Sequence, residues 1–236
     1  NIRMWSSNKP GGKLNYLLED LDMGFGYGGL SVSTDRLTLL RNPIAPSTSY
    51  SSDIIDTILY NPTYKRYFIN RYADLMNTAY IPDTLDKIVY SLRDSMANDM
   101  IPHFQKWGND TSIWRTNIED MRTWYKRRAP IVRNQLVSQF GLVKPVTWTL
   151  DVSPAGAGRI QISTVIPPQY PWSGIYFDGN PVTITAIPNP GYTFNHWASN
   201  TLGNPNLNQT VTVNYTASQL TTAYFTGSAA APGLYF

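Results

Sequence analysis

Hydrophobic positions between residues 52 and 140 recur at spacings of three and four, which is the period of an amphipathic helix. Helix-start signals stand at Ser52, Pro62 and Pro82. The pattern predicts helices that begin at these three points and two more, over residues 111–127 and 130–140. In the second helix, a stripe of large side chains is predicted to face the core: Tyr67, Phe68, Tyr72, Leu75, Met76 and Ala79.

Two other regions show the alternation of apolar and polar residues that is typical of β-strands. Residues 2–5 and 13–18 flank the turn sequence KPGG, which predicts a β-hairpin. From about residue 147 onward, seven short β-rich runs are each bounded by Pro, Gly or Asn: VTWTLDV, GRIQIST, GIYF, VTITAI, YTFNHWA, TVTVNY and TTAYFTG. This spacing predicts a small antiparallel sandwich or barrel. The predicted fold class is α+β, with an N-terminal hairpin and a helical part followed by an all-β, sandwich-like C-terminal domain.

The charged residues mark the domain boundary. Of the 19 Lys and Arg, 17 lie within residues 1–143, and 14 of the 16 Asp and Glu lie there too. Beyond that point the composition changes to one rich in Pro, Thr and Asn. We therefore expect one domain over residues 1–143 and a second, an antiparallel β-sandwich-like module, over residues 144–236.

Composition excludes several classes of function. The chain has no Cys, so it has no disulfide, no Cys-ligated metal and no thiol nucleophile. No run approaches about 18 consecutive apolar residues, so we expect no membrane span. The net charge is only +3, and the densest basic run, Lys126–Arg128, is predicted to be a solvated helix end. Neither feature indicates a nucleic-acid partner.

One acidic segment could hold a metal ion. Glu19, Asp20 and Asp22 follow the second hairpin strand, and glycines come directly after them. In an extended strand, Asp20 and Asp22 point to the same side, about 6–7 Å apart, close enough to bind one hard cation or two. Mg²⁺ or Mn²⁺ is the expected occupant, because carboxylate oxygens suit hard cations that also bind phosphate. The alternative is a solvated strand end in which an Asp caps a turn.

The two histidines and one aromatic loop are weaker candidates for functional residues. His103 and His196 lie in different predicted domains and form no metal-binding or catalytic pattern. The loop around Tyr170 and Trp172 could bind sugars through exposed aromatic rings, but core or interface packing is the favoured interpretation.

The motifs NIRMW, GGKLNYLLEDLDMGFGY and NPTYKRYFINRYADLMNT, in this order and spacing, resemble the spore-coat protein H (CotH) kinase-like family over about residues 1–140. The most specific elements are D-x-D-x-x-F-G at residues 20–26 and the run at residues 61–78. The later segment PWSGIYFDGNPVTITAIPNPGYTFNHW resembles the divergent internalin B-repeat modules of bacterial surface proteins.

The CotH resemblance implies the C-lobe portion of an atypical, secreted bacterial protein kinase. In that family pattern, Asn1 matches the metal-binding Asn of the catalytic loop and Asp20 the DFG-like catalytic Asp, with Asp22 as a second metal ligand. The implied cofactors are ATP and Mg²⁺ or Mn²⁺, and the implied reaction is phosphoryl transfer to Ser or Thr of a protein.

The same resemblance places a separate catalytic Asp about five residues before Asn1, outside this sequence, together with the nucleotide-clamping lobe. We therefore expect a fragment whose parent is the enzyme and which is inactive as an isolated chain, so its own status as an enzyme stays open.

Two alternatives remain. Asp20 and Asp22 could be the D-x-D of a metal-dependent glycosyltransferase, although the helix run at residues 61–78 argues against this. The chain could also be a surface binding or scaffolding protein with a vestigial kinase-like domain and a β-module that engages a cell-surface glycan or protein. An extracellular or cell-surface location fits both the kinase and the scaffolding interpretations.

Overall fold

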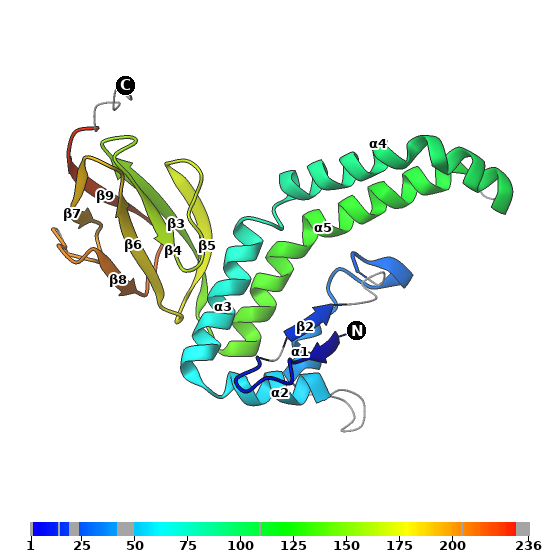
Figure 1. Cartoon of the computed structure of the whole chain (residues 1–236), viewed down its shortest axis with the longest axis horizontal. Helices are drawn as coiled ribbons and strands as arrows, with labels where there is room; N and C mark the ends of the chain where they lie inside the picture. Colours follow the sequence, from blue (N-terminus) through cyan, green and yellow to red (C-terminus); the bar gives the residue numbers. More distant parts are fainter. Residues whose placement is uncertain are drawn as a thin grey trace. The chain divides into compact units, whose positions relative to one another are not determined.

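The structure is a computed structural model that describes residues 2–13, 15–18, 24–41, 50–108, 110–203 and 205–229 (Figure 1). It contains two compact units. One consists of residues 1–57 and 81–132, and the other of residues 58–80 and 133–236.

The first unit contains the predicted hairpin and most of the helices. The hairpin pairs β1 (Ile2–Trp5) with β2 (Asn15–Leu18) in antiparallel register, which confirms its prediction. The other elements of this unit are η1 (Tyr27–Gly29), α1 (Arg36–Arg41), most of α2 (Tyr50–Leu59), α4 (Pro82–Trp107) and the first two thirds of α5 (Thr111–Phe140). In Figure 1, α4 and the beginning of α5 run side by side as a long helical hairpin.

Helix α5 corrects one prediction, because residues 111–140 form a single helix where two were expected. Pro130 lies inside this helix. A proline in a helix removes one backbone hydrogen bond and usually kinks or ends the helix. Here Tyr125 before the proline and Leu136 after it are both buried, so packing on both sides holds the helix together.

The second unit contains α3 (Pro62–Asn77), the end of α5 and two sheets. Its strands are β3 (Lys144–Ser153), β4 (Gly158–Ile162), β5 (Trp172–Asp178), β6 (Val182–Pro188), β7 (Tyr192–Ala198), β8 (Thr210–Val213) and β9 (Gln219–Gly227). The strand order is β5-β3-β9-β7 in one sheet and β4-β6-β8 in the other.

The strand pairing corrects a second expectation. The pairs β3–β5, β7–β9, β4–β6 and β6–β8 are antiparallel, but β3 and β9 run parallel, so the module is not purely antiparallel. Parallel neighbours need a long connection between them. Here the connection is the rest of the module, because β3 is its first strand and β9 its last.

The core of the module lies between its sheets. Alternate residues of β3 are buried, with Trp148 and Leu150 almost fully covered. The ring of Trp148 packs 4.0 Å from the ring of Tyr215, centroid to centroid. On β7, Trp197 is fully buried, while its neighbour His196 is only partly buried and stacks on Tyr224. The chain is thus α+β, with a helical N-terminal part and a sandwich-like C-terminal part.

Helix α3 begins where its sequence predicts. Pro62 is its first residue, and the side chain of Asn61 accepts hydrogen bonds from the backbone N–H groups of Thr63 and Tyr64. Its buried face, however, differs from the predicted aromatic stripe. Met76 is buried as predicted, but the other buried residues are Ile69, Asn70, Ala73 and Asp74, and the predicted Tyr67 is half exposed.

The two compact units divide the chain differently from the charge distribution, because α3 groups with the strands of the β-module. The domain boundary at residues 143 and 144 stays a prediction. Among the described residues, no helix is long and apolar enough to cross a membrane.

Candidate functional site

The predicted metal ligands Asn1, Asp20 and Asp22 lie outside the described residues, as does Glu19. Within the described part of the chain, no group of three or more His, Asp or Glu side chains is placed to hold a metal.

The segment that follows the acidic residues is anchored on α5. The indole N–H of Trp124 donates to the backbone carbonyl of Leu30 at 3.1 Å. The ring of Phe25 meets Trp124 and Tyr125 edge-on, with centroids 6.2 and 6.1 Å apart. These contacts fix the chain shortly after the predicted metal ligands.

Gly26 allows this close approach. Its φ is +88°, in the left-handed region that favours glycine. A Cβ at this position would lie 2.6 Å from the Cδ1 atom of Trp124. Any side chain at residue 26 would therefore push the segment away from α5.

The basic run Lys126–Arg128 lies inside α5 and not at its end, although Lys126 and Arg127 are exposed as the prediction of a solvated run requires. Arg128 donates to the backbone carbonyl of Val32, and its guanidinium lies over the ring of Trp124. The ammonium of Lys126 lies 3.3 Å from a carboxylate oxygen of Asp86 on α4. Sequence alone gave no partner for either cation.

A cavity of about 660 Å³ lies beside the anchored segment. Its lining combines residues Gly24 to Gly28 with residues of α5, including Trp114, Asp120 and Trp124. It is mostly apolar, with few polar groups, as ligand pockets usually are.

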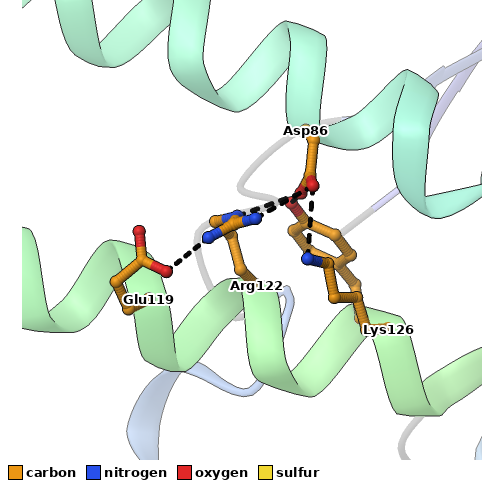
Figure 2. A network of polar contacts seen from close by, with 5 residues as sticks. Asp86, Glu119, Arg122 and Lys126 are labelled. Carbon is orange, nitrogen blue, oxygen red and sulfur yellow. Dashed lines mark hydrogen bonds and ion pairs between the residues drawn. The ribbon is translucent and has the colours of Figure 1, made fainter.

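The second feature of this unit is a polar network between α4 and α5 (Figure 2). Asp86 accepts hydrogen bonds from Nε and Nη2 of Arg122, at 3.0 and 2.9 Å, and from the hydroxyl of Tyr125. Arg122 also pairs with Glu119. The guanidinium of Arg122 lies 4.5 Å from the centre of the Tyr90 ring.

These contacts shift the titration of the network. Hydrogen bonds from Arg122, and next from Tyr125, hold the pKa of Asp86 well below its usual range. Burial, assisted by the neighbouring carboxylate of Asp86, raises the pKa of Tyr125 to about 12. Asp86 thus stays ionised and Tyr125 stays protonated near neutral pH. This arrangement fits a structural clamp rather than proton transfer.

In the second unit, Asp74 of α3 is fully buried and pairs with the β-module. One carboxylate oxygen accepts from the hydroxyl of Tyr176 at 2.7 Å. The other accepts from both the backbone N–H and the hydroxyl of Thr164, at 3.1 and 2.7 Å. Burial, together with the charge of Asp74, raises the pKa of Tyr176 far above its usual value.

Asn77, one turn further along α3, covers the edge strand β5. Its side-chain amide donates to the carbonyl of Ile175 at 2.9 Å and accepts from the N–H of the same residue at 3.0 Å. β5 is the outer strand of its sheet. Asn77 therefore supplies the donor and the acceptor that a neighbouring strand would supply.

Asn70 completes a polar stripe at positions i, i+4 and i+7 of α3. Its amide donates to the carbonyl of Pro181 at 3.0 Å, and its oxygen accepts from Asn180 at 2.7 Å. We call Asn70, Asp74 and Asn77 the α3 polar stripe. Sequence reasoning missed it, although its helical spacing was visible beside the aromatic residues.

Comparison with known families decides what this chain is. A family model described as CotH kinase protein matches residues 1–132, more than half of the 236 residues. This chain belongs to the CotH kinase family.

A second model, described as Divergent InlB B-repeat domain, matches residues 148–229. Neither the search of curated proteins nor the search of solved structures returned a match. The two family matches confirm the order of the two resemblances. The α3 polar stripe lies in the CotH match, and its partners Thr164, Tyr176 and Asn180 lie in the B-repeat match.

The remaining candidates of the sequence are placed as follows. The Tyr170 hydroxyl accepts from the N–H of Ile160 at 2.6 Å and donates to its carbonyl at 3.1 Å. Trp172 is partly buried at the start of β5. His103 lies edge-on to Phe104 in α4, where the described residues offer no metal site.

Proposed function

We propose that this CotH-family chain supplies metal- and nucleotide-binding residues for Mg²⁺–ATP-dependent phosphoryl transfer to Ser or Thr of a protein. The family match over residues 1–132 is the observation that carries the proposal. In this proposal Asn1, Asp20 and Asp22 hold Mg²⁺ or Mn²⁺, and Asp20 has the catalytic role of a DFG-like Asp.

The bound metal would neutralise charge on the triphosphate. The contribution of the described residues is positional. Trp124 and Arg128 bind the backbone at Leu30 and Val32, so they anchor the polypeptide about eight to ten residues after Asp22. A fixed anchor supports the proposal because phosphoryl transfer depends on positioning and on preorganised charge.

Metal and nucleotide binding test this proposal directly. Mn²⁺ binding is measured by the loss of the free-ion paramagnetic resonance signal, and ATP binding by equilibrium dialysis with and without Mg²⁺. Because the resemblance assigns nucleotide clamping to the parent protein, we expect the natural full-length protein to bind ATP saturably and only with Mg²⁺. Asp20→Asn and Asp22→Asn should each weaken Mn²⁺ binding by at least about tenfold, because each removes a charged ligand.

Asp99→Asn is the matched control, because Asp99 is an exposed carboxylate on α4. It should leave Mn²⁺ and ATP binding unchanged. If the natural full-length protein binds neither Mn²⁺ nor ATP, or if its Asp20→Asn variant binds both as tightly as the wild type, the proposal fails.

A second candidate is a surface binding or scaffolding protein in which the kinase-like part is vestigial. The match of residues 148–229 to a B-repeat domain favours it. Both candidates place the protein outside the cell or at the bacterial surface. Recovery of the natural protein from the surface or medium fraction, but not from the cytoplasm, is the expected result. A purely cytoplasmic protein would contradict this location.

A further inference from the structure

The β-module has very few charged side chains, and two of them lie at one place. Residues 145–229 contain only Asp151, Arg159 and Asp178 as charged residues. Asp178 is buried and accepts a hydrogen bond from the amide of Asn214 at 2.9 Å. The other two line a single cavity of about 550 Å³.

This cavity lies where β3 and β4 meet the loop before β5. Asp151 comes from β3, Arg159 from β4, and Gln169 from the loop. The rest of the lining is apolar side chains or backbone: Val152, Ala155, Gly156, Gly158, Ile166, Pro167, Pro168 and Tyr170. The volume falls within the range of small-ligand pockets.

The charged side chains that line the cavity, Arg159 and Asp151, have few hydrogen-bond partners within the described part of the protein. The side chain of Arg159 is exposed, and its guanidinium forms no hydrogen bond or ion pair with any described residue. Asp151 accepts a hydrogen bond from the N–H of its neighbour Val152 at 2.8 Å, and no ion pair joins it to Arg159 in the part of the chain that the structure describes. A guanidinium with five donors and a carboxylate with free lone pairs thus remain available to a ligand.

Unlike Arg159 and Asp151, Tyr170 has its polar group fully engaged within the protein. Its hydroxyl is fixed by the backbone of Ile160, so only its ring is available to a ligand. Ile166, which is 42% exposed, and the exposed Pro168 add further apolar surface, whereas Pro167 is buried.

The charged and apolar groups that line the cavity together indicate which class of ligand it can bind. One positive and one negative group give the cavity no net charge, so it has no preference for an anionic or a cationic polymer. A donor fork, an acceptor and an apolar wall match a pyranose ring, which presents vicinal hydroxyls at its edge and C–H groups on its face.

We propose that this cavity binds a segment of a neutral polysaccharide. Arg159 and Gln169 donate to sugar hydroxyls, Asp151 accepts from them, and Ile166 with Pro168 packs on a ring face. The proposal names the ligand class of the surface-binding candidate, and it does not depend on kinase activity.

Native affinity electrophoresis of the whole chain tests it. The gels contain one of three soluble neutral polysaccharides, hydroxyethyl cellulose, xyloglucan or glycol chitin, or the acidic polygalacturonate. We expect at least one neutral polymer to retard the wild-type chain. Arg159→Gln and Asp151→Asn should each weaken the apparent affinity by about tenfold, because each removes a charge-assisted hydrogen bond.

Lys144→Gln is the control, because it removes an exposed positive charge at the start of β3, outside the cavity lining. It should migrate as the wild type does, and near-UV circular dichroism checks that all variants keep the native fold. Retardation by no neutral polymer, equal retardation of all variants, or retardation by polygalacturonate alone would each overturn the proposal. This test measures polysaccharide binding by variants of Arg159 and Asp151, whereas the metal-binding test uses variants of Asp20 and Asp22. Failure of one proposal can therefore be told apart from failure of the other.

Discussion

At the scale of single residues, Gly26 offers the sharpest test of the anchored segment. Gly26→Ala places a methyl group against Trp124 and also strains a backbone with φ of +88°. We expect it to detach residues 24–30 from α5. Hydrogen exchange of these amides should then become faster by about tenfold or more, in line with a loss of roughly 1–3 kcal/mol.

Gly29→Ala separates the clash from the strain. Gly29 has φ of +77°, but a Cβ there would meet no atom within 4 Å. This variant should show only the smaller effect of a left-handed alanine, about 1 kcal/mol. Equal exchange rates in the two variants would show that contact with Trp124 does not hold the segment.

Asp86 makes the stability of the first unit depend on pH. Because its pKa is lowered in the folded state, its contribution is complete above the unfolded pKa of about 4 and is lost as pH falls. We therefore expect the unfolding midpoint of the wild type to drop as the pH is lowered from about 5 to 2. In Asp86→Asn, the midpoint should be lower at pH 7 and should change less over this interval.

The exposed Asp99 again provides a control on the same helix. Asp99→Asn should keep the acid dependence of the wild type in thermal scans followed by circular dichroism. An Asp86→Asn protein with the full wild-type dependence would show that other carboxylates cause it.

At the scale of elements, Asn77 closes the open edge of β5. Asn77→Ala removes both hydrogen bonds to Ile175 and leaves its backbone groups without these partners. At about 1 kcal/mol per hydrogen bond, the second unit should lose roughly 2 kcal/mol of stability. Urea unfolding measures this loss, and exchange at the Ile175 amide should accelerate.

Asn195→Ala is the comparison, because Asn195 is an exposed amide on β7. It should change stability by less than about 0.5 kcal/mol. Asn77→Asp should be at least as harmful as Asn77→Ala, since a carboxylate would face the carbonyl of Ile175. If Asn77→Ala unfolds with the same free energy as the wild type, water replaces the amide of Asn77 without loss of stability, and the prediction is wrong.

The elements also show what sequence can and cannot predict. Local signals such as Asn61 with Pro62 place the start of α3, because a capping side chain and a proline act within one turn. The α3 polar stripe was missed because polar side chains are expected to face water. Here they face a sheet edge, whose backbone groups lie about a hundred residues away in sequence.

The prediction of two helices in place of α5 was wrong for a related reason. Pro130 is a local stop signal, but buried Tyr125 and Leu136 are contacts that only the folded chain provides. The candidate metal site was predicted from a local motif and a family resemblance, and its residues lie outside the described part. Its position relative to Trp124 and Gly26 therefore rests on sequence distance alone.

At the scale of the whole molecule, family boundaries and compact units do not coincide. The CotH match ends at residue 132 and the B-repeat match begins at residue 148, yet α3 belongs to the same compact unit as the strands. A helix from one family match thus completes the fold of the other. We infer that the β-module of this chain needs α3 to be stable and monomeric.

Cutting the chain at the compositional boundary tests this inference. A polypeptide of residues 144–236 keeps strands β3 to β9 but loses α3 and the end of α5, so β5 becomes an open edge and the hydroxyl of Tyr176 loses Asp74. Unpaired edges promote association between chains, and an unpartnered buried hydroxyl costs about 1–3 kcal/mol. We expect this polypeptide to associate in sedimentation velocity and to melt below the second unit of the whole chain. A stable, monomeric module with an unchanged melting temperature would refute the dependence on α3 and would make the B-repeat match an independent domain.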